Sequence, residues 1–401
     1  MPKNKTVAAA ALIVLAYIAF ISLGLPDGLL GVAWPSMRIE FSRSLDSLGL
    51  MLTASMTGYL VSSFLSGRVI TRWGVGRVLA ASCGATGAAL IGYTLVPYWW
   101  MVIFLSVVAG LGAGAIDAGI NTYVASNFGE KLMQWLHASY GIGITMGPVI
   151  MTAGINYFTS WKLGYVIVGV LQLFLCAVFA FTAPLWKNGA EKNNEQNAQP
   201  VSGAITSDAT IMDTLGSLNV WLSIFMFFFY AGIEASIGSW TYTLLTGSRG
   251  VSSELAGLLV GSYWGSFTIG RILAGFFTKR VTMNDLIYYS LFAAFAGGLL
   301  LWLNPFGGSD LLGVAVIGFA IAPIFPGMVS LTENRVGKKF AVNTIGMQIG
   351  AAGLGLAAIP GITGVFAQRI SLEIIPVLIL LWIIILLAIY RVAGLTKLSE
   401  K

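Results

Sequence analysis

Three acidic side chains lie inside long apolar stretches of the sequence: Asp27, Asp117 and Glu234. The other thirteen acids fall in polar segments or at the ends of such stretches. A carboxylate at bilayer depth costs about 3 kcal/mol to insert, so it usually faces a cavity or a partner. A carboxyl that takes up and releases a proton there can couple that proton to a second ligand. A structural role as a hydrogen-bond acceptor between helices is the alternative for Asp27.

Small and polar neighbours accompany the first two acids. Gly24 and Gly28 flank Asp27, and glycines allow close approach of a ligand or of another helix. Asp117 and Asn121 are four residues apart, so a helix presents them on one face as a carboxylate beside an amide. We expect all three acids to serve in proton coupling, and Asn121 to line a substrate site with them.

Further polar and aromatic groups in apolar stretches are candidates for the same substrate site. His137 is the only histidine; its titration range suits proton coupling, although a lone histidine is more often part of the core. Gln348 offers an amide. Tyr140, Trp240 and Tyr263 could stack on the apolar face of a sugar ring, although most aromatic residues in such a chain are packing or interfacial anchors.

Three arginines are candidates for a gate. Arg271 is the basic residue inside an apolar stretch, and it either extends toward the membrane surface or pairs with a carboxylate. Arg72 and Arg280 each follow a glycine, Gly67 and Gly275, by five residues in the two halves of the chain. This repetition predicts equivalent positions at two helix ends.

The composition is that of a polytopic membrane protein. Of the 401 residues, 57% are hydrophobic and 9% are charged, against about 25% charged in soluble domains. The net charge of +6 lies in short segments between apolar stretches, which indicates membrane topology rather than nucleic-acid binding. Cys83 and Cys176 are interpreted as small core residues. No nucleotide motif, nucleophilic triad or metal-ligand spacing is present, so we expect no cofactor, no metal and no enzymatic activity.

Twelve membrane spans are expected, six on each side of a polar linker. We therefore predict a first bundle at 1–185, a cytoplasmic linker at 186–217 and a second bundle at 218–401. The predicted spans are 7–33, 46–67, 75–96, 98–126, 133–158, 163–185, 218–245, 252–278, 283–304, 309–331, 340–367 and 370–394.

The distribution of lysine and arginine predicts the orientation. If both termini are cytoplasmic, sixteen of the 22 basic residues lie inside and five outside, with Arg271 within a span. This excess satisfies the positive-inside rule. Parallel repeats of six spans joined by a cytoplasmic linker are typical of the major facilitator architecture, in which the substrate site lies near the midplane.

The chain resembles the fucose–galactose–glucose:proton symporter family of the major facilitator superfamily. The resemblance covers the whole chain. Its most specific parts are the acid at Asp27, the segment Gly112–Asn121, the segment Leu136–Gly143, the segment Tyr230–Trp240 and the segment Gly270–Gly275.

The resemblance implies that Asp27 and Asp117 take part in substrate recognition and proton coupling. Two departures are Asp117 where the family pattern has Glu, and Glu234 where it has Gln. At the inner gate, Thr71 and Lys279 stand where the superfamily's loop motif has Asp. The usual acidic partner of the gate arginines is therefore missing.

These observations predict a monomeric, multi-pass protein of the cell inner membrane that imports a small neutral solute, a sugar, with protons by alternating access. Sodium in place of the proton is an open alternative. A proton-driven exporter of apolar drugs, or a lipid carrier, also fits lone acids in an apolar lining. A sensor without transport would need a cytoplasmic domain, for which 186–217 is too short.

Overall fold

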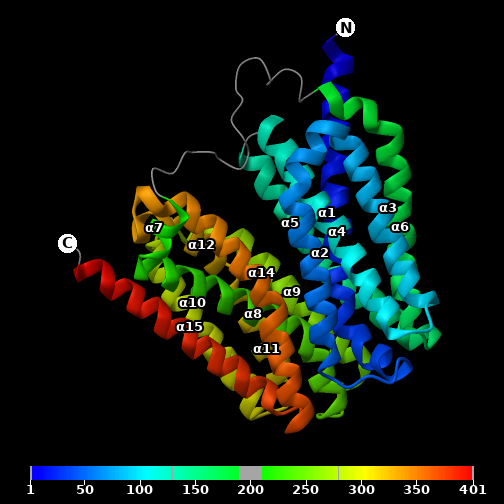
Figure 1. Cartoon of the computed structure of the whole chain (residues 1–401). Coiled ribbons are helices and arrows are strands. Elements are labelled where there is room, and N and C mark those ends of the chain that lie inside the picture. Colours follow the sequence, from blue (N-terminus) through cyan, green and yellow to red (C-terminus); the bar gives the residue numbers. More distant parts are fainter. Residues whose placement is uncertain (1, 128–129, 189–209, 279, 400–401) are drawn as a thin grey trace. The chain divides into compact units, whose positions relative to one another are not determined.

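The chain folds into helices throughout the part that the computed structural model describes, which is residues 2–127, 130–188, 210–278 and 280–399 (Figure 1). It divides into two units: Met1–Arg43 with Leu50–Val201, and Ser44–Gly49 with Ser202–Lys401. Residues 189–209 of the expected linker lie outside the described residues, so the flexible linker stays a prediction.

Long helices dominate both units, because an apolar segment in lipid must satisfy its backbone hydrogen bonds internally. In the first unit they are α1 (Pro2–Glu40), α2 (Ser47–Trp73), α3 (Val75–Leu95), α4 (Trp99–Asn127), α5 (Glu130–Phe158), α6 (Trp161–Thr182) and the 3-10 helix η1 (Ala183–Asn188). The helices of the second unit, three of them short, are α7 (Ile211–Leu215), α8 (Leu218–Gly247), α9 (Ser253–Phe277), α10 (Met283–Leu303), α11 (Ser309–Ile321), α12 (Ile324–Ser330), α13 (Thr332–Val336), α14 (Lys338–Arg369) and α15 (Ile374–Ser399).

Eleven stretches of the described chain are long and apolar enough to cross a membrane. The one expected span that is not among these eleven is the eighth, 252–278. It is the helix α9, whose 25 residues extend over about 38 Å. Its hydropathy is lower because it carries Arg271 and polar residues such as Ser262 and Ser266. The sequence therefore predicted the existence of this helix, although hydropathy alone does not select it.

The tenth expected span is broken in the middle. The helix α11 ends at Ile321 and α12 begins at Ile324, with Pro323 between them. Proline has no backbone N–H to donate to the preceding turn, so the hydrogen-bond ladder is interrupted at this point. The break places Phe325 beside α8, where its ring centroid lies 5.7 Å from that of Tyr230.

Glycines let the helices of the first unit approach closely. A Cβ added at Gly24 would lie 2.7 Å from the backbone nitrogen of Ile144, and one at Gly143 would overlap the Ile21 carbonyl oxygen. The helices α1 and α5 therefore pack backbone to backbone. The helices α2 and α4 do the same, because a Cβ at Gly114 would overlap the Tyr59 carbonyl oxygen.

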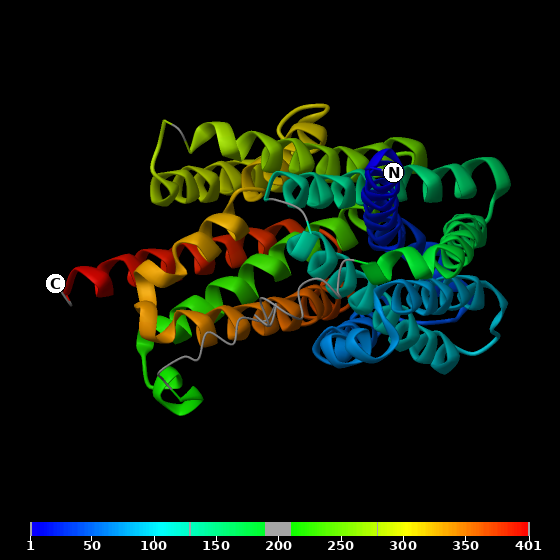
Figure 2. The same ribbon diagram turned by 90° about the horizontal axis from the view of Figure 1, so that it is seen from above.

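The second unit repeats this arrangement with equivalent helices. A Cβ at Gly355 of α14 would overlap the Phe228 carbonyl oxygen of α8, and Figure 2 shows α8 (green) alongside α14 (orange). Between α9 and α11, a Cβ at Gly318 would overlap the Tyr263 carbonyl oxygen. The first and fifth spans of each half, and the second and fourth, thus pack through glycines, as expected for two copies of one six-span repeat.

One ion-pair cluster joins three helix ends of the second unit. Arg249, just after α8, donates to Glu373 through two nitrogens at 3.1 and 2.8 Å, and to Asp310 at 2.5 Å. Burial opposes the charge of Arg249, but the hydrogen bonds to Glu373 and the charge of Asp310 raise its pKa overall. The hydrogen bond from Arg249 lowers the pKa of Glu373.

Candidate functional site

The first carboxylate, Asp27, is hydrogen-bonded to a tyrosine of a neighbouring helix. The hydroxyl of Tyr140 on α5 donates to Asp27 Oδ2 at 2.7 Å. The glycine-mediated approach of α1 and α5 brings the two side chains within reach, since Gly28 of α1 also lies against the Ile144 carbonyl. Asp27 is exposed rather than sealed among helices. Its carboxylate is therefore available to a ligand while it is held in position by a neutral donor.

The second carboxylate, Asp117, has two neutral donors. The hydroxyl of Tyr59 on α2 donates to Asp117 Oδ2 at 2.5 Å, and Asn121 Nδ2, one turn along α4, donates to Oδ1 at 2.9 Å. The close contact of Gly114 with the Tyr59 backbone places that tyrosine beside Asp117. The expected pairing of Asp117 with Asn121 on one helix face is present.

The two acids of the first unit belong to one electrostatic cluster. The charges of Asp27 and Asp117 act on each other, and His137 on α5 acts on Asp117. His137 is exposed, and its ring contacts Phe20 edge to face at a centroid distance of 5.9 Å. Among the ion pairs of the described residues, none joins Asp27 or Asp117 to a lysine or an arginine. The first unit therefore holds a cluster of two carboxylates with neutral donors and one histidine.

The third carboxylate, Glu234, lies in a different environment in the second unit. The charge of Arg271, on α9, acts on it directly, and Tyr230, one turn earlier on α8, interacts with both charges. The Tyr263 hydroxyl donates to the Glu234 backbone carbonyl at 3.0 Å, which ties α9 to α8. Glu234 is half-buried, whereas Tyr230 is 1% exposed. This carboxylate therefore has the charge of Arg271 in its electrostatic surroundings.

Arg271 is part of this cluster within the second unit. Its guanidinium carbon lies 4.4 Å from the centroid of the Phe267 ring, one turn earlier on α9. Its Nε atom is buried and has no hydrogen-bond partner. The structure therefore gives Arg271 a nearby carboxylate and an aromatic ring, which agrees with the carboxylate pairing considered from the sequence. Its role as a gate residue stays a prediction.

Two other predicted site residues have their polar atoms partnered inside the protein. Trp240 is fully buried, and its indole N–H donates to the Pro360 carbonyl at 3.0 Å. Gln348 is 1% exposed and exchanges hydrogen bonds with the Thr332 hydroxyl at 3.0 and 3.1 Å. Both contacts link segments of the second unit, and the role of the two side chains in substrate binding stays a prediction.

The two other gate candidates lie at helix ends. Arg72 is exposed near the end of α2, and Arg280 is exposed after α9. Their equivalent placement agrees with the repeat, and their role as gate residues stays a prediction.

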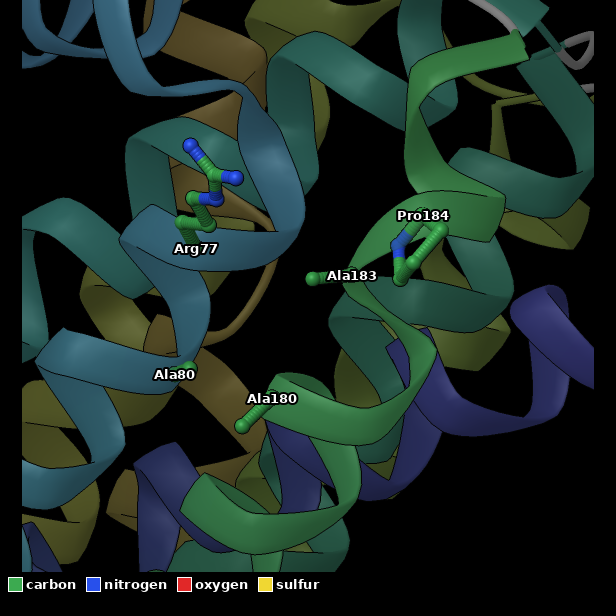
Figure 3. Close-up of a pocket in the computed structure, with 5 residues that line it drawn as sticks. All are labelled: Arg77, Ala80, Ala180, Ala183 and Pro184. Carbon is green, nitrogen blue, oxygen red and sulfur yellow. The ribbon is translucent and has the colours of Figure 1, made fainter.

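A separate cavity of about 370 Å³ lies between α3 and the end of α6 (Figure 3). Its walls are Ala80, Ala180, Ala183 and Pro184, and its one charged lining residue is Arg77. It gathers none of the carboxylates or amides that the sequence singled out. Among the described residues, no group of three or more His, Cys, Asp or Glu side chains is arranged to hold a metal ion.

Sequence reasoning missed Tyr59 and gave Tyr230 no role. Both hydroxyls lie inside spans: Tyr230 precedes Glu234 by four residues on α8, whereas Tyr59 reaches Asp117 only because α2 packs against α4. The available signal was Gly58-Tyr59, a tyrosine beside a glycine on the second span, but many such pairs are packing residues. The partner of a buried acid on another helix is not visible from spacing.

The fold and these clusters define a multi-pass membrane protein built from two repeated helical units with ionisable groups at depth. The model of the Major Facilitator Superfamily matches residues 16–360. The chain therefore belongs to the major facilitator superfamily, and it is a transporter of that class, as the resemblance predicted.

Similar proteins include carriers of sugars. The chain is 24% identical over 353 residues to the glucose/mannose transporter GlcP of Bacillus subtilis (strain 168), covering 87% of this chain and 86% of that one. It is 25% identical over 397 residues to the sodium-dependent glucose transporter 1 of Homo sapiens, and the match covers 88% of this chain and 72% of that one.

A solved structure also matches the fold. A bacterial homologue of the human lysosomal transporter Spinster is 14% identical, with a TM-score of 0.78, and the match covers 99% of this chain and 98% of that one.

Proposed function

We propose that this protein imports a small neutral sugar together with protons, by alternating access, in the cell inner membrane. The observation that carries the proposal is the pair of carboxylates, Asp27 and Asp117, in one cluster at bilayer depth with tyrosine and amide donors. A neutral donor orients a carboxylate without pairing it with a fixed cation, so the carboxylate can still take up a proton. Such a group can bind a proton in one state and release it in another.

Substrate contact at the same atoms would link the proton to the sugar. A protonated carboxyl donates a hydrogen bond, whereas an ionised one only accepts. A sugar hydroxyl at Asp27 or Asp117 therefore has a different affinity for the two protonation states, and this difference is the coupling free energy of a symporter. The similarity to glucose carriers supports a sugar as the solute.

The orientation and assembly are part of the proposal. The excess of lysine and arginine in the segments assigned to the inside favours cytoplasmic termini. We expect a monomer to carry out transport. Sodium is the alternative driving ion, because the human relative is named a sodium-dependent transporter.

The test is transport of labelled glucose into liposomes that contain the purified full-length protein. Accumulation should follow an imposed pH gradient and should not require a sodium gradient. Asp27→Asn and Asp117→Asn should each abolish accumulation while retaining glucose counterflow, which needs no driving ion, at reduced affinity. The matched control is Glu333→Gln, which neutralises an exposed acid and should leave both activities unchanged.

Full accumulation by both Asn variants would overturn the assignment. Accumulation that follows only the sodium gradient would replace the proton with sodium. Extrusion of an apolar cationic dye without sugar counterflow would favour the drug exporter.

A further inference from the structure

The cluster around Glu234 contains a buried donor that the protein leaves without a partner. The Arg271 Nε atom is buried and makes no hydrogen bond. An unsatisfied buried donor destabilises the protein unless a ligand or water completes its hydrogen bond. Tyr230 is 1% exposed, and its hydroxyl interacts with both Arg271 and the half-buried Glu234. One unpartnered guanidinium donor near a half-buried carboxylate forms an incomplete hydrogen-bond network.

The surroundings of this network suit the ring of a carbohydrate. Tyr263, Phe267 and Arg271 follow one another at intervals of four residues and share one face of α9. The Phe267 ring covers one side of the guanidinium, and Phe325 lies against Tyr230. Flat apolar rings beside a few fixed polar groups are typical of sites for small polar ligands.

The charge balance of the cluster also differs from that of a proton carrier. The charge of Arg271 acts on Glu234, whereas no lysine or arginine forms an ion pair with Asp27 or Asp117 in the described part of the chain. A carboxylate accepts hydrogen bonds, and a guanidinium donates them. Adjacent acceptor and donor groups match two neighbouring hydroxyls of a sugar, each of which can donate to the carboxylate or accept from the guanidinium.

We propose that Glu234, Arg271 and Tyr230 form a diol-binding subsite in the second unit, with Glu234 and Arg271 contacting two adjacent hydroxyls of the transported sugar. This inference rests on the proposed sugar transport and adds to it a named set of specificity residues. Arg271 is then a substrate-binding residue rather than a gate. Glu234 binds the substrate and does not carry the coupling proton.

The experiment pairs protein variants with altered ligands. The full-length protein in liposomes is assayed by glucose counterflow, with each monodeoxyglucose as competitor, for the wild type, Glu234→Gln, Arg271→Lys and Tyr230→Phe. In the wild type, removing one hydroxyl of the diol should weaken competition by about tenfold. Glu234→Gln and Arg271→Lys should each weaken the affinity for glucose by about tenfold. In these variants, removal of the same hydroxyl from the competitor should weaken competition little further.

Arg271→Lys is the most informative variant because it keeps the positive charge and loses the planar fork of donors. Tyr230→Phe removes one hydroxyl at nearly constant volume, so it keeps the test decisive if a charge variant fails to fold. The control variant is Glu254→Gln, an exposed acid in the first turn of α9, which should behave as the wild type.

The outcomes separate this inference from the proposed function. If the penalties of the deoxy sugars are the same in the variants as in the wild type, the three residues do not contact the diol and the inference is overturned. Wild-type affinity in Arg271→Lys would show that the arginine only balances charge, which also overturns it. If the wild type exchanges no sugar at all, both the inference and the proposed function fail.

Discussion

Both units carry acids inside their long apolar helices but surround them with different partners. In the first unit, Asp27 and Asp117 receive hydrogen bonds from Tyr140, Tyr59 and Asn121, all of them neutral. In the second unit, Glu234 lies beside Arg271. A neutral donor orients a carboxylate, whereas a cation also attracts its charge. The two copies of one repeat therefore surround their acids with different electrostatics.

The largest expected effect comes from giving the first unit the cation that the second unit has. In Asn121→Arg, a guanidinium replaces the amide that donates to Asp117 at 2.9 Å. The new guanidinium favours the ionised form of Asp117, and each 1.4 kcal/mol of this preference lowers the proton affinity of Asp117 about tenfold. We therefore expect proton-driven glucose accumulation to fall by about tenfold or more. Glucose accumulation in liposomes measures it. Asn121→Gln, which keeps an amide, is the control, and undiminished accumulation in Asn121→Arg would contradict the comparison.

Glycine contacts should matter equally in the two units. Gly143→Ala and Gly355→Ala each insert a Cβ into the backbone of a facing helix, at Ile21 and Phe228. We expect each to destabilise its unit by about 1–3 kcal/mol, since the helices must move apart. Thermal unfolding of the purified protein in detergent measures the loss.

A matched control lies on the same helix as Gly355. Gly350→Ala meets no atom within 4 Å, so it should leave stability unchanged or raise it by up to about 1 kcal/mol through helix propensity. A larger loss in Gly350→Ala than in Gly355→Ala would show that the close packing is not what stabilises α8 against α14.

The smallest expected effects are those of the ion pairs at the helix ends. Glu373→Gln removes the partner of Arg249, and the 43% exposure of Glu373 limits the loss to about 1 kcal/mol. In the first unit, Glu40 and Lys162 form a pair with 42% and 40% exposure, so Glu40→Gln should cost less. Thermal unfolding at neutral pH compares the losses of stability in Glu373→Gln and Glu40→Gln.

The pH dependence identifies the contribution of Glu373. Its folded-state pKa is lowered by the hydrogen bond from Arg249, so its stabilisation is complete above the ordinary value of 4.5 and is lost as the pH falls through the folded pKa. The difference in melting temperature between wild type and Glu373→Gln should therefore shrink below pH 4.5. A difference that grows on acidification would contradict this sign.

The sequence predicted the helices well because apolar length and charge placement are local properties. It did not predict the interruption of the tenth span, where Pro323 separates α11 from α12. The span 252–278 is present as α9, although Arg271 makes it less apolar. The candidate site was predicted in part. Spacing on one helix predicted the contact of Asp117 with Asn121, but no pattern indicated Tyr59, which comes from α2.

The sequence by itself determined that the chain is a two-fold repeat of membrane helices with three acids inside apolar spans. Insertion energy and helix periodicity depend on residues that are close in sequence, so both follow from the sequence directly. Only the tertiary structure decided what each acid meets. The Tyr140 hydroxyl reaches Asp27 because α1 and α5 pack through glycines, and Arg271 acts on Glu234 from the neighbouring helix α9. Both contacts join residues that are distant in sequence, so spacing along one helix does not predict them.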